Sequence, residues 1–307
     1  MNILFAGTPH SSASILKYLA NHENISVKGV ITQPNKRGKR GKKLNESPVA
    51  IQAKVLELDV FKPKSLDNKE LKDILGKFSD IDYLVVVAYG KIVPAWLLSL
   101  PRVASVNAHF SILPKYRGAS PIQSALLNGD TETGISFIEI NSNLDAGDII
   151  SLHKIKILSH DNKLTLEKKL TDKCIDEIFK TLSDFKDHKI LAYLQDKSKA
   201  TYCKKISKND SFTNFNEKSL NIINKFRAFY EWPGLAFNHN DITIKIHGIE
   251  ISKENSEGKP GKIQKIEKDG IYINTKDKMI VITHLQFPNK KIISSTDVYN
   301  SYQKFFK

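Results

Sequence analysis

The chain has 307 residues, of which 40% are hydrophobic and 26% are charged. This composition supplies enough apolar material for one large or two ordinary folded domains and argues against wholesale disorder. Lys and Arg outnumber Asp and Glu by 47 to 33, and the net charge of +14 favours a polyanionic partner, nucleic acid before a membrane surface. A generally lysine-rich proteome is the alternative source of this charge.

No run of apolar residues reaches the roughly 18 that a membrane-spanning helix needs. A strand pattern begins at residue 2, so we expect no secretory or transit segment. The two cysteines, Cys174 and Cys203, lack the spacing of metal ligands and suit a reducing compartment. We therefore expect a cytoplasmic protein that holds no metal and does not bind a membrane.

Strand and helix patterns alternate over the first two hundred residues. In chain order they predict a strand at 3–6, a helix at 12–20, a strand at 25–31, helices at 48–58 and 68–75, strands at 83–88 and 103–106, a helix at 121–127, strands at 134–140 and 149–157, and a helix at 163–185. The run at 83–88 is continuously apolar, which is typical of a central strand covered on both faces. This alternation predicts an α/β fold built on a parallel sheet.

The pattern changes near residue 200. A polar, lysine-rich stretch at 198–211 is typical of a linker, and a short helix is predicted at 218–229. Short strands separated by turn residues follow at 242–249, 261–266, 270–274, 279–285 and 291–293. Such spacing predicts a small β-barrel. We expect one domain at 1–207, with its linker from about residue 190, and a second at 208–307.

The segment at 35–43 is the most basic part of the chain. Six cations lie in it, and two glycines separate them: Lys36, Arg37, Lys39, Arg40, Lys42 and Lys43. It joins a predicted strand to a predicted helix, and loops at the carboxyl ends of parallel strands line the ligand crevice of such folds. We interpret it as an anion-binding loop, with a solvated run of charge as the alternative.

Asn107 and His109 follow a predicted strand, and strand alternation sends both side chains to the same side. A carboxamide and a protonated imidazole can both donate to an oxyanion. Asp145 follows a separate strand and could hold His109 charged. Together the three residues predict an acid/base site with an oxyanion stabiliser, although a single buried His is often only structural. Gly7 begins no G-x-G-x-x-G motif, which argues against a dinucleotide site.

Several motifs, in this order, resemble the methionyl-tRNA formyltransferases of the folate-dependent formyltransferase family. The resemblance covers nearly the whole chain and rests on FAGTP (5–9), RGKKL (40–44), VVAYGKIVP (86–94), NAHFSILPKYRGASPIQ (107–123), LDAGDI (144–149) and RAF…WPG (227–234). It implies a Rossmann-like domain followed by an OB-like barrel. It also implies transfer of the formyl group of 10-formyltetrahydrofolate to the α-amino group of methionyl initiator tRNA, which yields formylmethionyl-tRNA for translation initiation.

The resemblance also implies roles for individual residues. The family's catalytic residues fall on Asn107, His109 and Asp145. The folate site falls on two segments: Ser111, Ile112, Leu113 and Pro114, and Val87, Ala88, Tyr89 and Gly90. The six cations of 35–43 would contact the acceptor stem of the tRNA. Among them, Arg40 falls on the position that most clearly marks the family's tRNA-binding loop. We expect a monomer.

Other functions remain open on the sequence. A formyltransferase of the same superfamily that acts on an amino sugar nucleotide or on glycinamide ribonucleotide would explain the three catalytic residues equally well. It would not need the basic loop or a basic second domain. A non-catalytic tRNA-binding protein would explain the charge but not Asn107, His109 and Asp145.

Overall fold

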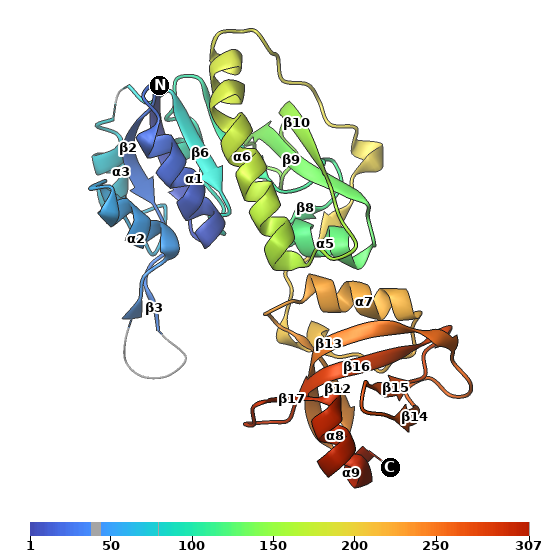
Figure 1. Ribbon diagram of the computed structural model, residues 1–307. Coiled ribbons are helices and arrows are strands. Elements are labelled where there is room, and N and C mark those ends of the chain that lie inside the picture. Colours follow the sequence, from blue (N-terminus) through green and yellow to red (C-terminus); the bar gives the residue numbers. More distant parts are fainter. Residues whose placement is uncertain (38–43, 79, 307) are drawn as a thin grey trace. The chain divides into compact units, whose positions relative to one another are not determined.

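The computed structural model describes residues 1–37, 44–78 and 80–306 (Figure 1). Contacts between residues divide the chain into two compact units. The first unit comprises Met1–Pro121, Glu132–Lys156 and Glu167–Cys203. The second comprises Ile122–Thr131, Ile157–Leu166 and Lys204–Lys307, so two segments from before residue 207 pack with the carboxyl-terminal part of the chain.

A seven-stranded sheet forms the centre of the first unit, in the order β10-β9-β7-β6-β1-β2-β5 (Figure 1). Its strands are β1 (Asn2–Gly7), β2 (Ser26–Ile31), β5 (Val60–Phe61), β6 (Tyr83–Val87), β7 (Ala104–His109), β9 (Glu132–Glu139) and β10 (Ile149–Lys156). Five neighbours, from β7 to β5, run parallel, which confirms the predicted Rossmann-like sheet. β9 runs antiparallel to both β7 and β10. For β10 the reason is the short connection, which cannot make the crossover of about a dozen residues that a parallel pair requires.

The helices of the first unit are α1 (His10–Asn21), α2 (Pro48–Val55), α3 (Lys69–Leu75), α4 (Ala95–Leu98) and most of α6 (Lys163–Lys186), whereas α5 (Pro121–Leu127) begins at its boundary. α6 shows why they form. Five of its side chains recur at every fourth position and are fully buried: Leu166, Leu170, Cys174, Ile178 and Leu182. One apolar stripe therefore faces the interior along the whole helix. Burial also raises the pKa of the Cys174 thiol, which keeps it protonated.

Two short pairs of strands complete the first unit. β3 (Lys36–Arg37) pairs with β4 (Leu44–Asn45) at the two ends of the basic segment. β8 (Arg117–Gly118) runs parallel to β11 (Tyr202–Cys203). The second pair brings the end of the first unit beside the segment that follows His109.

An antiparallel sheet forms the centre of the second unit, in the order β12-β13-β16-β15-β14, with β17 added beside β16. Its strands are β12 (Leu235–His239), β13 (Ile242–Asn255), β14 (Ile263–Ile266), β15 (Ile271–Ile273), β16 (Lys278–Gln286) and β17 (Ile292–Ser294). The helices of this unit are α7 (Ser219–Ala228), α8 (Ser295–Ser301) and α9 (Gln303–Phe306). The predicted second domain of short strands is thus confirmed, and its strands form an antiparallel sheet. No pairing of the described residues joins β12 to β14, and closure into a barrel stays a prediction.

α7 is tied to the earlier segments of its unit by Arg227. The guanidinium donates from Nε to the Asp161 carbonyl oxygen at 2.6 Å and from a terminal nitrogen to the Leu158 carbonyl oxygen at 2.8 Å.

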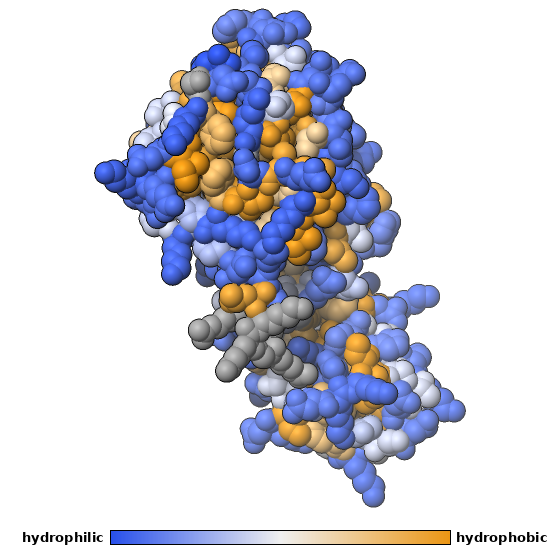
Figure 2. All heavy atoms as spheres, turned by 90° about the vertical axis from the view of Figure 1, so that its left-hand side faces the viewer, coloured by the Kyte–Doolittle hydropathy of each residue, from blue (hydrophilic) through white to orange (hydrophobic). Residues whose placement is uncertain are grey.

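Figure 2 shows that hydrophilic side chains cover most of the visible face of this unit. Among the described residues, no helix is long and apolar enough to cross a membrane.

Asp277 stabilises the start of α7, and this contribution depends on pH. Burial alone would raise the pKa of Asp277, but hydrogen bonds from the Ser219 and Lys278 backbone and the Thr275 hydroxyl outweigh it and lower the pKa to about 2. A carboxylate whose pKa is depressed by folding stabilises the protein fully above its ordinary pKa near 4, and this is lost as the pH falls toward 2. We expect Asp277→Asn to cost about 1 kcal/mol at pH 7, since the site is exposed to solvent.

The measurement is urea unfolding of the wild type and of Asp277→Asn at pH 7 and again at about pH 2 or below. The two midpoints should differ at neutral pH and converge in acid. A difference that persists unchanged in acid would show that the carboxylate charge is not the stabilising group.

Candidate active site

The carboxyl ends of β6 and β7 position the first candidate residues. β7 alternates, so Asn107 and His109 project to the same side of the sheet. β6 and β9 pair with β7 on either side and fix both residues: Asn107 lies opposite Val86 and Ile138, and His109 lies opposite Ser136. The two side chains therefore sit on a rigid element.

Asp145 lies in the loop between β9 and β10 and reaches the same place. Its Oδ1 accepts a hydrogen bond from Asn107 Nδ2 at 3.2 Å, and its Oδ2 accepts one from the Gly118 N–H at 2.8 Å. Oδ2 also lies 3.7 Å from His109 Nδ1, an ion-pair distance. The structure thus brings Asn107, His109 and Asp145 together around one carboxylate.

The loop that carries Asp145 has an unusual backbone. Asp145 has a φ of 48°, in the left-handed region that non-glycine residues rarely occupy. At Gly147, a Cβ would lie 1.7 Å from the Glu139 carbonyl oxygen, so only glycine fits there. The loop holds Asp145 in a conformation that its surroundings must enforce.

His109 has acceptors at both ring nitrogens. Its Nδ1 faces Asp145, and its Nε2 lies 2.9 Å from the Tyr116 carbonyl oxygen. The imidazole is only 6% exposed, so water does not replace these partners. A carbonyl oxygen can only accept, so Nε2 is the donor to Tyr116, whereas Nδ1 lies beyond hydrogen-bond distance of the Asp145 carboxylate.

The segment after β7 is fixed by Ser136 of β9. Ser136 Oγ accepts from the Leu113 N–H at 2.9 Å and donates to the Ser111 carbonyl oxygen at 2.6 Å. Ser111 is fully buried and donates to the Lys115 carbonyl oxygen at 2.6 Å. Of the predicted folate-site residues in this segment, Ile112 and Pro114 are partly exposed, whereas Ser111 and Leu113 are buried.

The second predicted folate segment follows β6. The Tyr89 carbonyl oxygen accepts from Thr8 Oγ1 at 2.9 Å and from Gln33 Nε2 at 2.8 Å, which joins three loops at the carboxyl edge of the sheet. The Tyr89 ring lies in the core, and burial raises its pKa to about 12. Val87 is also buried, so only Ala88 and Gly90 are exposed at this edge.

The basic segment is described only at its ends. Lys36 is exposed on β3. The backbone of Arg37 pairs with that of Leu44. The other four predicted cations, Lys39, Arg40, Lys42 and Lys43, lie outside the described residues.

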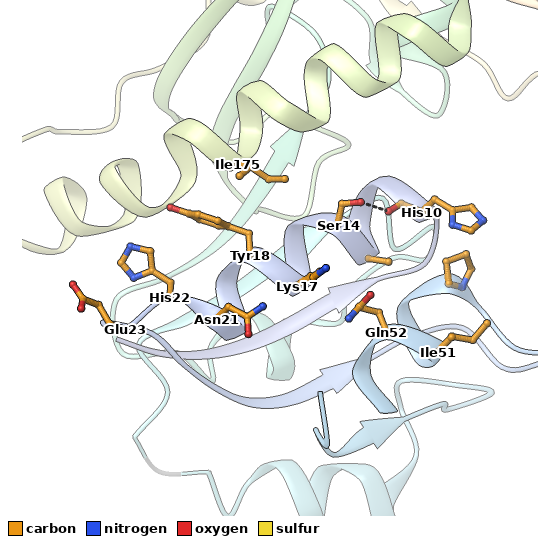
Figure 3. Close-up of a pocket in the computed structure, with 12 residues that line it drawn as sticks. His10, Ser14, Lys17, Tyr18, Asn21, His22, Glu23, Ile51, Gln52 and Ile175 are labelled. Atoms are coloured by element: carbon orange, nitrogen blue, oxygen red, sulfur yellow. Dashed lines mark hydrogen bonds between the residues drawn. The ribbon is translucent and has the colours of Figure 1, made fainter. Parts of the chain in front are cut away.

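Figure 3 shows a groove of about 1020 Å³ elsewhere on the first unit. Side chains of α1 and α2 and Ile175 of α6 line it, with His10, Tyr18 and His22 on or beside α1. Asn107, His109 and Asp145 are not among the lining residues, so the groove is not the candidate active site. In the part of the chain that the structure describes, no cluster of three metal-ligating side chains occurs.

Sequence reasoning missed four groups that contact His109, Asp145 or the support of Asp145. They are the Tyr116 carbonyl, the Gly118 N–H, Arg117 and Gln195. The first three lie in the YRG part of the motif at 107–123. The motif therefore indicated that these residues matter, but not which groups they bind. No sequence signal marks Gln195.

Comparisons with known proteins agree with this fold. Residues 1–182 match the family described as formyl transferase, and residues 205–303 match the formyl transferase C-terminal domain. The sugar 3N-formyltransferase WlaRD shares the fold, with a TM-score of 0.65 at 20% identity over 95% of this chain and 99% of that one. HypX from Aquifex aeolicus, solved with tetrahydrofolic acid, gives a TM-score of 0.61 at 16% identity, over 99% of this chain and 47% of that chain. The fold and both matches define a formyltransferase.

Curated relatives narrow this class. Proteins named methionyl-tRNA formyltransferase are 39% identical in Finegoldia magna, over 97% of this chain and 96% of the relative, and 36% identical in Sulfurihydrogenibium sp., over 99% and 97%. One from Francisella tularensis is 38% identical over 98% and 95%. The chain therefore belongs to the methionyl-tRNA formyltransferase family. These full-length matches favour that function over the amino sugar nucleotide alternative.

Proposed function

We propose that the chain transfers the formyl group of 10-formyltetrahydrofolate to the α-amino group of methionyl initiator tRNA. The observation that carries the proposal is the Asp145 carboxylate, which joins Asn107 to His109 in a chain that matches its named relatives over nearly their full length. Folate compounds are named with two proteins of the same fold, WlaRD with 5-N-formyltetrahydrofolate and HypX with tetrahydrofolic acid.

Each of the three residues has a role in this reaction. The neutral α-amine attacks the formyl carbon, and negative charge develops on the formyl oxygen. One N–H of Asn107 already binds Asp145, and the second remains to donate to that oxygen. A protonated His109 would donate as well, from Nδ1, since Nε2 is already bonded to the Tyr116 carbonyl oxygen, and one such donor is worth about 3 kcal/mol. Asp145 faces the imidazole and orients it, while the bond from the formyl carbon to N10 breaks and the proton of the amine passes to N10 of the leaving folate.

The folate donor would lie along the edge formed by the two segments after β6 and β7. Ile112 and Pro114 offer apolar surface there, and exposed Ala88 and Gly90 allow close approach to the backbone. Ser111, Leu113, Val87 and Tyr89 would support this edge from within, since their side chains are buried.

The tRNA would bind through its phosphates. Residues 1–200 hold 29 basic and 22 acidic residues, and six of the basic ones lie in 36–43, so the rest of that part is close to neutral. Residues 201–307 hold 18 basic and 11 acidic residues. We propose that the segment at 35–43 contacts the acceptor stem and that the domain at 208–307 binds the tRNA backbone, in a monomeric cytoplasmic protein.

The test is an assay of formyl transfer to methionyl initiator tRNA, with free methionine and an amino sugar nucleotide as competing acceptors. We expect transfer to methionyl-tRNA to exceed transfer to either alternative by several orders of magnitude. Preference for the sugar nucleotide would assign the chain to the other branch of the superfamily.

A further inference from the structure

One polar side chain of the segment after α6 is buried although its neighbours are not. Gln195 is 7% exposed, whereas Leu194 is 79% exposed and Asp196 also faces solvent. A buried polar side chain costs free energy unless hydrogen bonds satisfy it. The partners of Gln195 therefore indicate what it does.

Both the nitrogen and the oxygen of the Gln195 side-chain amide are fully hydrogen-bonded. Its Nε2 donates to the Asp145 carbonyl oxygen at 2.9 Å and to the Gly147 carbonyl oxygen at 2.7 Å. Its Oε1 accepts from two nitrogens of Arg117, Nε at 3.1 Å and a terminal nitrogen at 2.7 Å. The four hydrogen bonds satisfy every donor and acceptor site of a primary amide.

These contacts hold the backbone on both sides of Ala146. Asp145 has a left-handed φ, and the hydrogen bonds from Gln195 to the residues at 145 and 147 oppose its relaxation. Without them, only the hydrogen bonds from Asn107 and the Gly118 N–H would hold the carboxylate in place.

Arg117 extends the same support to the other side of the site. It is 4% exposed, and its bond to Gln195 anchors β8, whose next residue, Gly118, donates its N–H to Asp145. A single amide thus fixes the main chain at Asp145 and, through Arg117, the strand that binds its carboxylate.

We propose that Gln195 is a positioning residue for formyl transfer, which acts through Asp145. The inference rests on the function proposed above. Its hydrogen bonds run to Arg117 and to the backbone of Asp145 and Gly147, so it orients the carboxylate rather than the substrate. A displacement of a catalytic group by about 1 Å can slow a reaction by about 100-fold.

Two variants test this role. Gln195→Ala removes all four hydrogen bonds. Gln195→Glu keeps the size and the bond to Arg117 but sets carboxylate oxygen against the carbonyl oxygens of Asp145 and Gly147. We expect both to lower kcat by about 10- to 100-fold, with the KM values for folate donor and methionyl-tRNA changed less than about threefold. The Glu variant keeps the hydrogen bonds from Arg117, now as an ion pair, and should fold.

Gln52→Ala is the matched control, since Gln52 lies on α2 among the residues that line the groove of Figure 3. It should retain the wild-type kcat. The decisive measurement combines Gln195→Ala with Asp145→Asn. If Gln195 acts through Asp145, its removal costs less than about twofold in that background, whereas an independent structural role would multiply the two losses.

The outcomes separate the two proposals. A wild-type protein that does not formylate methionyl-tRNA overturns the proposed function and this inference with it. An active wild type together with an unchanged kcat in Gln195→Glu, or with multiplicative losses in the double variant, overturns the role of Gln195 alone.

Discussion

Replacement of Asp145 by Asn is expected to slow formyl transfer by about 10²- to 10⁴-fold. The Asp145 oxygens accept from Asn107 Nδ2 and from the Gly118 N–H, and one of them faces His109 Nδ1. An amide can turn its single oxygen to only one side, so its NH₂ group meets a donor on the other. The substitution also removes the negative charge that faces the His109 ring.

The measurement is the single-turnover rate with saturating folate donor and methionyl-tRNA, which excludes effects on binding. Asp59→Asn is the matched control, because Asp59 is an exposed aspartate of the same unit and the substitution changes the charge in the same way. It should react at the wild-type rate. A rate within about threefold of the wild type in Asp145→Asn would remove Asp145 from the catalytic site.

Local patterns were sufficient to predict the long elements. The helix predicted at 163–185 is α6, because its apolar side chains repeat at every fourth position. The helix at 121–127 is α5, since Pro121 suits the first helical turn. Short elements were missed: α4 makes a single turn, and β8 and β11 are two residues each and exist only because they pair with one another across more than eighty residues of chain.

Some residues of the candidate site were also predictable from local patterns, and others were not. Strand alternation placed Asn107 and His109 on one side of β7, and the structure shows them there. Their shared partner Asp145 was predicted from its place after a separate strand and from a resemblance. Gln195 could not be predicted, because a single Gln in a polar linker carries no local signal. Its burial arises only from Arg117 and from the backbone at 145–147, which approach it in the folded protein.

Replacement of the cations at 36–43 by Ser is expected to lower kcat/KM for methionyl-tRNA by about 10²-fold or more. For each cation that no longer neutralises a phosphate, the slope of log kcat/KM against log salt should also fall by about 0.7 to 0.9. The expectation rests on charge: removing these six residues leaves the rest of 1–200 close to neutral. Because β3 and β4 pair through their backbones, the substitutions preserve the pairing at the ends of the segment.

A small acceptor separates this effect from damage to the catalytic residues. Methionine esterified to adenosine offers the same α-amine without a stem, so its formylation should be equal in the wild type and in the variant. Loss of activity toward both acceptors would show that the segment shapes the active site instead of binding RNA. If the slope of log kcat/KM against log salt is unchanged with methionyl-tRNA, these cations do not contact the phosphates. The basic residues of 208–307 would then have to supply that contact.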